Sequence, residues 1–170
     1  RILPQTSAAA GRAVFDGAVR SLVGQTPGGT LLFYSPGGIL IGQAGSFDTG
    51  SLLLATGPVT ASAASGGARA FTVDGAAESR AGITNLGTIT TAGEAMLVAP
   101  RIVQRGTLTA GGGVALVAAE DAVLRIANGL FDIEVTAGTQ AAAGDAVLVD
   151  HAGRTVGTGE NGVTLVGVSR

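Results

Sequence analysis

Short alternating runs of apolar and polar residues recur along this chain, and many of them end at a glycine. Runs such as 88–90 (Thr-Ile-Thr) and 95–98 (Ala-Met-Leu-Val) are short and rich in branched or other apolar side chains, as β-strands are. The intervening segments Thr-Ala-Gly-Glu and Ala-Gly-Gly-Gly have the composition of turns. No segment of comparable length could be a crossover helix, so the pattern predicts an all-β protein.

The runs repeat with a period of 19 residues in the middle of the chain. The segment 83–99 (ITNLGTITTAGEAMLVA) superposes on 102–118 (IVQRGTLTAGGGVALVA), so that Gly87 falls on Gly106, and each unit contains two such runs. A repeat of this length is typical of architectures in which successive units stack on one another. The repeat predicts a β-solenoid with coils of about 19 residues, in which parallel strands are spaced by about 4.8 Å.

Further runs extend this pattern toward both ends of the chain. The segment 29–42 predicts two apolar strands around a Pro-Gly-Gly turn, and 51–56 predicts another. Later, 130–138 supplies an alternating run. The runs 144–149 and 162–166 predict one and the same strand in two successive coils, 18 residues apart.

Two segments do not follow the repeat. The apolar residues of 13–23 have helical spacing but also alternate around Asp16-Gly17, and a strand is the preferred interpretation. The segment 57–82 interrupts the period, which predicts an excursion from the coils. We expect a hairpin there, with strands near Val59–Ser62 and Ala70–Val73.

The composition excludes several functional classes. Glycine contributes 29 of 170 residues, yet 46% of the chain is hydrophobic, so the sequence predicts one folded domain over 1–170 rather than a disordered linker. All ten basic residues are arginine, and the net charge of −2 gives no electrostatic footprint for nucleic acid. The absence of cysteine excludes disulfides and thiolate metal sites.

Four lines of this sequence resemble the secretion domain of two-partner secretion exoproteins, the filamentous haemagglutinin family. The line 35–42 (SPGGILIG) is similar to the family's Asn-Pro-Asn-Gly-Ile-x-Phe-Gly, and 47–52 (FDTGSL) is similar to its Val-Asp-x-Gly-Gly-Leu line. The lines 85–89 and 112–116 are similar to Asn-x-Gly-x-Ile and Gly-Gly-x-Val-x-Leu. The motif residues that the resemblance marks for transporter recognition are Ser35, Pro36, Gly38, Ile39, Gly42, Asp48 and Gly50.

This resemblance implies a right-handed parallel β-helix with an extra-helical hairpin at 57–82. It implies export through an outer-membrane two-partner transporter, and a location at the bacterial cell surface or in the medium. The chain would be a piece of a longer exported protein whose coils it templates. Its role would be structural, in adhesion or fibre assembly, with self-association or a host or matrix glycan or protein as further partners.

The segment Asp48-Thr49-Gly50 shares its letters with the signature of aspartic proteases. That chemistry needs a carboxylate at the end of a buried strand and a second carboxylate that shares its proton. Gly45 and Ser46 precede Phe47 instead of an apolar run, and no second Asp-Thr-Gly occurs. We therefore expect Phe47 to point inward and Asp48 to lie in a turn, where it accepts backbone hydrogen bonds.

Other candidate chemistry is equally sparse. Asp150 and His151 are adjacent, and 150–155 predicts a polar turn rather than part of a catalytic triad. The twelve acids are scattered, so the sequence predicts no metal site, no cofactor and no enzyme activity. One alternative function remains, because an outward threonine ladder could bind a glycan or ice; its residues are Thr88, Thr90, Thr107 and Thr109.

Overall fold

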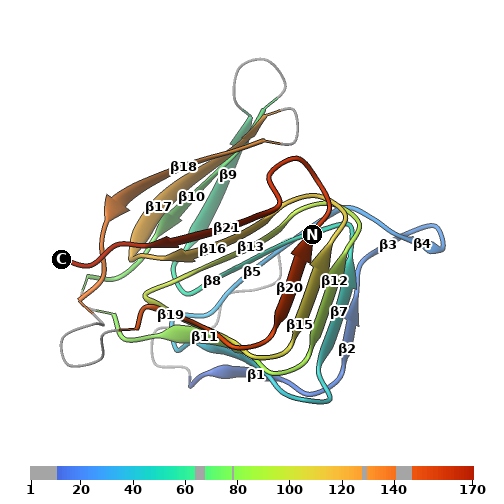
Figure 1. Ribbon diagram of the computed structural model, residues 1–170, viewed down its shortest axis with the longest axis horizontal. Helices are drawn as coiled ribbons and strands as arrows, with labels where there is room; N and C mark the ends of the chain where they lie inside the picture. The colour runs from blue at the N-terminus through green and yellow to red at the C-terminus, as the bar shows by residue number, and fades with distance from the viewer. Residues whose placement is uncertain (1–10, 64–67, 78, 128–129, 141–146) are drawn as a thin grey trace.

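A computed structural model describes residues 11–63, 68–77, 79–127, 130–140 and 147–170. All secondary-structure elements in these residues are β-strands, so the all-β prediction is confirmed (Figure 1). Most strands are three to five residues long. The arrangement of the strands, rather than their existence, is what positions the candidate site.

Three five-stranded parallel sheets form most of the molecule, and we call them together the parallel stack. Sheet 1 contains β1 (Ala13–Phe15), β6 (Ile39–Ile41), β11 (Gly82–Asn85), β14 (Arg101–Gln104) and β19 (Val149–His151). Sheet 2 contains β2 (Ala18–Arg20), β7 (Ser46–Thr49), β12 (Thr88–Thr91), β15 (Thr107–Ala110) and β20 (Arg154–Gly157). Sheet 3 contains β5 (Thr30–Tyr34), β8 (Ser51–Ala55), β13 (Ala95–Ala99), β16 (Val114–Ala118) and β21 (Val163–Gly167).

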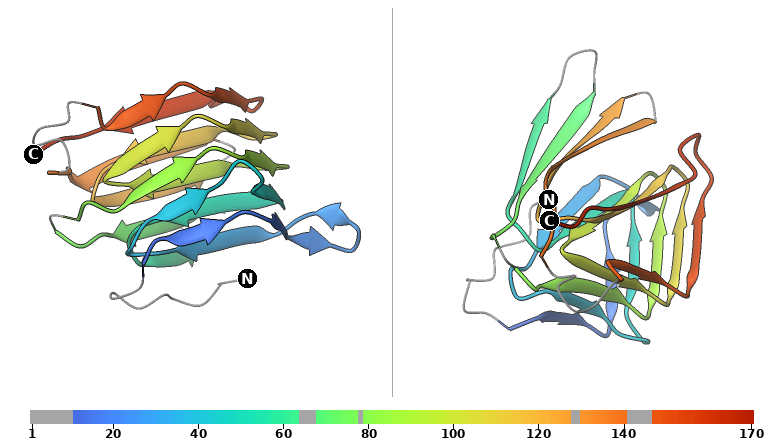
Figure 2. Two further views of the ribbon diagram at one scale, coloured as in Figure 1. Left: turned by 90° about the horizontal axis from the view of Figure 1, so that it is seen from below. Right: turned by 60° about the vertical axis from the view of Figure 1, so that its left-hand side comes forward.

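The chain passes through sheets 1, 2 and 3 in turn, and we call one such passage a circuit. Successive circuits lie on one another in chain order, as the colours of Figure 2 show. The strand register equals the sequence repeat, because Ile83 pairs with Ile102 and Thr88 pairs with Thr107. Each repeat supplies three strands, one more than the two runs recognised in the sequence.

A four-stranded antiparallel sheet, which we call the cover sheet, lies outside the stack. It contains β18 (Leu130–Ala137), β17 (Asp121–Ala127), β10 (Arg69–Asp74) and β9 (Val59–Ala63), in that order. The two strands expected between 57 and 82 are present as β9 and β10, and they pair antiparallel. The alternating run at 130–138 forms β18, but it belongs to the cover sheet and not to the stack.

Two sequence interpretations of the terminal regions have different outcomes. The segment 13–23 forms strands, as preferred, and then a small hairpin of β3 (Leu22–Val23) and β4 (Thr26–Pro27). The predicted equivalence of 144–149 and 162–166 is wrong. Val149 pairs with Ile102 in sheet 1, whereas Val163 pairs with Val114 in sheet 3, so the described parts of the two runs belong to different sheets of one circuit. Residues 144–146 lie outside the described residues.

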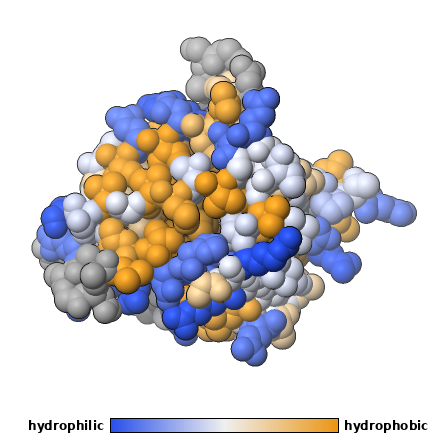
Figure 3. Space-filling model, in the orientation of Figure 1, coloured by the Kyte–Doolittle hydropathy of each residue, from blue (hydrophilic) through white to orange (hydrophobic). Residues whose placement is uncertain are grey.

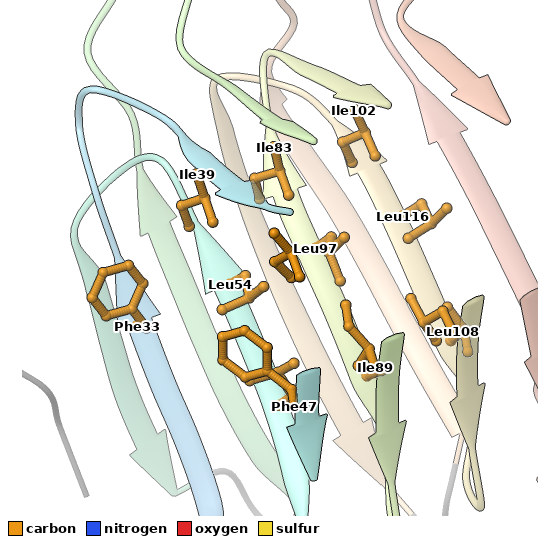
Figure 4. Close-up of a cluster of buried hydrophobic side chains, with 14 of the residues drawn as sticks. Phe33, Ile39, Phe47, Leu54, Ile83, Ile89, Leu97, Ile102, Leu108 and Leu116 are labelled. Carbon is orange, nitrogen blue, oxygen red and sulfur yellow. The ribbon is translucent and has the colours of Figure 1, made fainter. Parts of the chain in front are cut away.

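The inward side chains of the three parallel sheets meet in one core, where residues of successive circuits form ladders (Figure 4). Full burial of one such aliphatic side chain stabilises the fold by about 1.5–3 kcal/mol. The ladder of sheet 3 consists of Phe33, Leu54, Leu97 and Leu116, that of sheet 1 of Ile39, Ile83 and Ile102, and that of sheet 2 of Phe47, Ile89 and Leu108.

A second core fills the layer between sheet 3 and the cover sheet. Its fully buried members on sheet 3 include Leu53, Met96 and Val98. The cover sheet contributes Phe71 and Leu124, which are cross-strand partners on β10 and β17. The two excursions from the stack are far apart in the sequence, yet they pair with each other and together bury the outer face of sheet 3.

Glycines at the corners between sheets 1 and 2 allow the circuits to approach closely. A Cβ atom built on Gly106 would lie 2.1 Å from the carbonyl oxygen of Gly87, and one built on Gly87 would lie 2.2 Å from that of Gly45. Gly153 meets the carbonyl oxygen of Gly106 in the same way, at 2.3 Å. The glycine of the sequence repeat is therefore required because any larger residue would push two circuits apart.

Candidate functional site

The line 35–42 forms the corner that leads from sheet 3 into sheet 1. The N–H of Gly38 donates to the carbonyl oxygen of Ser35 (3.0 Å), which closes a tight turn around Pro36 and Gly37. Gly38 has a φ of 96°, a conformation that glycine adopts without strain. A Cβ there would also lie 2.9 Å from the carbonyl oxygen of Gly82. The turn thus fixes how the chain enters β6.

Most side chains of this line are not accessible to a partner. Ser35 and Ile39 are fully buried, and Gly38 and Gly42 are also buried. Pro36 is half-exposed and Gly37 is exposed. The surface that the motif offers is therefore the tip of the turn, while the other residues determine its shape.

The two remaining motif glycines, Gly42 and Gly50, differ in how closely they are packed. Gly42 donates its N–H to the carbonyl oxygen of Phe15 (2.9 Å), and a Cβ on Gly42 would overlap the carboxylate of Asp16. A Cβ on Gly50 would lie 2.3 Å from the carbonyl oxygen of Gly29 in the preceding circuit. Gly50 therefore excludes a larger residue for structural reasons alone, whereas at Gly42 the overlap is with one exposed side chain that can rotate away.

Asp48 lies in strand β7, so the predicted turn at this residue is wrong. The alternation of β7 buries Phe47, as expected, and turns Asp48 outward, where it is half-exposed. Its partners in register are Arg20 on β2 and Thr90 on β12, and neither is an acid. Pairing of β7 with β2 and β12 keeps this segment extended instead.

Ser51, the last residue of the Asp-Thr-Gly-Ser segment, takes part in an ion-pair cluster that sequence reasoning missed. Its hydroxyl donates to Glu94 Oε2 (2.9 Å), and Arg69 of the cover sheet donates to the same oxygen (2.9 Å). Arg69 also donates to the hydroxyl of Thr30 (3.2 Å). The cluster therefore fastens the cover sheet to the stack.

The environment of Glu94 favours its charged form. Partial burial acts to raise the pKa of this carboxyl. Hydrogen bonds from its own backbone N–H and from Ser51, together with the Arg69 guanidinium, act in the opposite direction and outweigh it. The pKa of Glu94 is consequently below its ordinary value, and the ion pair persists in mild acid.

A second acid, Glu120, is almost completely buried where the chain leaves β16. Its carboxylate accepts hydrogen bonds from the guanidinium of Arg170 and from the N–H of Gln140. Arg170 also donates to the carbonyl oxygen of Gly138 (3.0 Å). This cluster ties the segment after β21 to the segment after β18, so it has a structural role.

The four predicted ladder threonines lie side by side on the outer face of sheet 2. Thr88 pairs with Thr107 and Thr90 pairs with Thr109; the first residue of each pair is exposed and the second is half-exposed. The rows continue on β7 with Ser46 and Asp48, and on β20 with Arg154 and Val156. Because charged residues adjoin the hydroxyl rows on both sides, the flat threonine surface covers two strands.

Asp150 and His151 lie in strand β19, so the polar turn predicted for them is wrong. Asp150 faces outward and forms an ion pair with Arg105 (2.6 Å). The His151 ring contacts the hydroxyl of Thr155 through Nε2 (2.9 Å). Adjacent residues of a strand point to opposite faces, so the two side chains do not act on one substrate.

Asn85 and Gln104 form a buried polar pair inside the stack, at the corner between sheets 1 and 2. The side-chain amide of Asn85 donates to Gln104 Oε1 (2.9 Å). Asn85 Oδ1 accepts from the N–H of Gly87 (3.1 Å), and Gln104 donates to the carbonyl oxygen of Gly106 (3.2 Å). The 19-residue repeat aligns the two amides, and this alignment was the signal that could have revealed the pair.

The described residues contain no group of three or more histidines and acids that could hold a metal ion. Within the same part of the chain, no helix is long and apolar enough to cross a membrane. No protein-family model matches the sequence, and no curated protein matches it either.

Proposed function

We propose that this chain is a non-enzymatic structural module, a right-handed parallel β-solenoid of a secreted or surface-associated bacterial protein. The observation that carries the proposal is the constant 19-residue register shared by all three sheets over the third and fourth circuits. Parallel strands with one connection pattern are expected to wind in the right-handed sense. The ion pairs of Glu94 with Arg69 and of Glu120 with Arg170 join separate segments of the fold, which supports a scaffold.

The more specific proposal is a secretion domain like that of the filamentous haemagglutinin family. It is supported by the order of the four similar lines and by their places in the fold. The line 35–42 forms a corner and a core strand, and 57–82 leaves the stack as a hairpin. The proposed partner is an outer-membrane two-partner transporter, which would contact the turn tip at Pro36 and Gly37.

The end of the stack formed by β19, β20 and β21 supports a role in extending the fold. Each of these strands is the last of its sheet, and the inward residues Val163 and Leu165 are 39% and 53% exposed. Apolar residues gather over this end in Figure 3. In the proposed function, further β-coils of an exported shaft add here, and the shaft carries the adhesive or fibre-forming surfaces.

Export with a cognate transporter tests the secretion proposal. The chain, behind a signal peptide, is produced in a Gram-negative host with and without an outer-membrane transporter of the two-partner type. We expect transporter-dependent appearance of the folded chain in the medium. Equal amounts in the medium with and without the transporter would overturn the proposal.

Two variants separate recognition from folding in this assay. Gly37→Lys places a long charged side chain on the exposed tip, and we expect reduced export of a chain that still folds when refolded in vitro. Gly38→Val is strained at a φ of 96° and is expected to reduce folding as well as export.

A second candidate function, binding of a glycan or ice, is favoured by the paired threonine rows of sheet 2. Thr88→Lys together with Thr107→Lys would abolish inhibition of ice recrystallisation, or binding to a glycan array, and leave export unchanged. A wild-type chain without either binding activity would remove this candidate.

A further inference from the structure

The interior row at the corner between sheets 1 and 2 changes character along the stack. Its residues, paired in register from one circuit to the next, are Phe15, Ile41, Asn85, Gln104 and His151. The first two are apolar, and the last three can form hydrogen bonds. We call the last three the polar row.

The first two members of the polar row, Asn85 and Gln104, are each recognised by the following circuit in the same way. The carbonyl oxygen of Asn85 accepts hydrogen bonds from the N–H groups of Arg105 and Gly106 (both 2.9 Å). The carbonyl oxygen of Gln104 accepts from Ala152 (3.0 Å) and Gly153 (2.9 Å). Each pair of N–H groups, which we call the N–H fork, belongs to the two residues that follow the next member of the row. One short segment of the following circuit therefore supplies both the N–H fork and the next polar side chain.

The three strands of the polar row share one sequence pattern. It reads aliphatic, any residue, polar, any residue, glycine in 83–87 (ITNLG), 102–106 (IVQRG) and 149–153 (VDHAG). The glycine is required because its position faces the carbonyl oxygen of the preceding corner glycine. The pattern therefore describes a segment that can stack on a circuit whose corner carries a polar-row residue.

His151 is the last member of the row. β19 is the edge strand of sheet 1, and the His151 ring is exposed, whereas Gln104 is fully buried. Among the described residues, the ring's hydrogen-bond partner is Thr155, which itself occupies an inward position, in register with Leu108. A segment that covered His151 would bury both polar side chains.

We propose that this end of the stack binds an extended segment of the pattern aliphatic-x-amide-x-glycine, with its Asn or Gln side chain over His151. Such a segment would supply the N–H fork to the carbonyl oxygen of His151 and a hydrogen bond to the ring. An aliphatic residue at the same place would leave the buried imidazole with Thr155 as its single partner and the other ring nitrogen unsatisfied, which is costly. The inference deepens the proposed function, on which it rests, because it specifies which coils can follow.

A peptide of this protein's own sequence is the probe. A synthetic peptide of residues 101–118 is titrated into the isotope-labelled chain, and backbone amide shifts are followed by NMR. The comparison peptide carries Gln104→Leu. We expect shift changes confined to 147–157 and 162–167, and about three- to tenfold weaker binding of the leucine peptide.

Variants of the chain sharpen this test. His151→Leu is expected to reverse the preference between the two peptides, whereas Asp150→Asn, on the outward side of the same strand, leaves it unchanged. If His151→Leu does not fold, the inference is still tested by whether the wild-type chain binds the wild-type peptide more tightly than the Gln104→Leu peptide. Equal binding of the two peptides, shift changes at the β1–β2 end, or no binding at millimolar peptide would overturn the inference. Failure of export with this preference intact would remove the secretion role alone.

Discussion

Sheet 3 and sheet 2 are neighbouring sheets of the same stack, yet their strands differ in burial. The strands β8, β13 and β16 are buried at every position, while β12 and β15 alternate between buried and more exposed positions. The cause is the cover sheet, which packs on the outer face of sheet 3, whereas sheet 2 has solvent outside. Continuously apolar strands are expected where both faces of a sheet are covered, so 51–55 and 95–99 carried a signal for a second layer.

The largest expected difference in stability is between a charge placed on the outer face of sheet 3 and one placed on the outer face of sheet 2. Val98→Asp would bury an unpaired carboxylate between sheet 3 and the cover sheet, and we expect a loss of about 4 kcal/mol or more in the free energy of unfolding. Thr88→Asp, on the exposed face of sheet 2, should change it by about 0.5 kcal/mol or less. Urea denaturation measures both, and similar losses would contradict the difference between the two faces.

Adjacent residues of β13 separate the two cores. Leu97→Ala and Met96→Ala should each cost about 2–5 kcal/mol, because both side chains are fully buried. Leu97 faces the core of the stack and Met96 faces the cover sheet. Hydrogen exchange should therefore quicken mainly in β9, β10, β17 and β18 for Met96→Ala, and throughout the stack for Leu97→Ala. The same exchange pattern for both variants would show that the two layers open as one unit.

Replacing a glycine at a packed corner should destabilise the fold more than replacing a glycine with no neighbouring atoms at its Cβ position. Gly106→Ala would place a methyl group 2.1 Å from a carbonyl oxygen, and we expect a destabilisation of about 1–3 kcal/mol as the circuits shift apart. Gly17→Ala is the matched control, because nothing lies within 4 Å of its Cβ position. Thermal unfolding monitored by circular dichroism decides between them, and a neutral Gly106→Ala would contradict the close packing.

The smallest effect concerns the ion pair that fastens the cover sheet to the stack. Glu94→Gln should cost about 1 kcal/mol or less at neutral pH, because Arg69 is 44% exposed. The pKa of Glu94 is lowered in the folded state, so its stabilising contribution is present above the unfolded-state pKa and is lost as the pH falls through the folded-state value.

The stability difference between wild type and Glu94→Gln should therefore shrink below about pH 4.5. Urea midpoints measured between pH 7 and pH 3 test this, with Glu160→Gln at an exposed position as the control. A difference that grew in acid would contradict the assignment.

The sequence predicted strand positions and register well where adjacent circuits have similar sequences. The alignment of Gly87 with Gly106 predicted the register of the third and fourth circuits, and the pattern of 57–82 predicted β9 and β10. The sequence was least informative where the sheet to which a strand belongs is decided by residues far away in the chain. The strand β17 was not anticipated, and β18 was assigned to the stack, because a short alternating run is compatible with any sheet that has one covered face.

The errors in the candidate site have the same origin. Asp48 and the pair Asp150 and His151 were placed in turns because their letters are frequent in turns, but pairing with neighbouring circuits keeps both segments extended. The ion pair of Glu94 with Arg69 joins the stack to an excursion, so no local pattern could predict it. The amides Asn85 and Gln104 were aligned by the repeat, yet their inward direction depends on the twofold alternation of β11 and β14.

By itself, the sequence determined that the chain is all-β, how its repeats are spaced and where small residues form corners, because these features depend on local alternation and on like residues stacking. Tertiary structure alone decided that the two separate excursions join into one sheet over sheet 3, and that Arg69 of this sheet pairs with Glu94 of the stack. Pairing of β10 with β17 brings together segments about fifty residues apart, and only the burial of a shared apolar face specifies that partner.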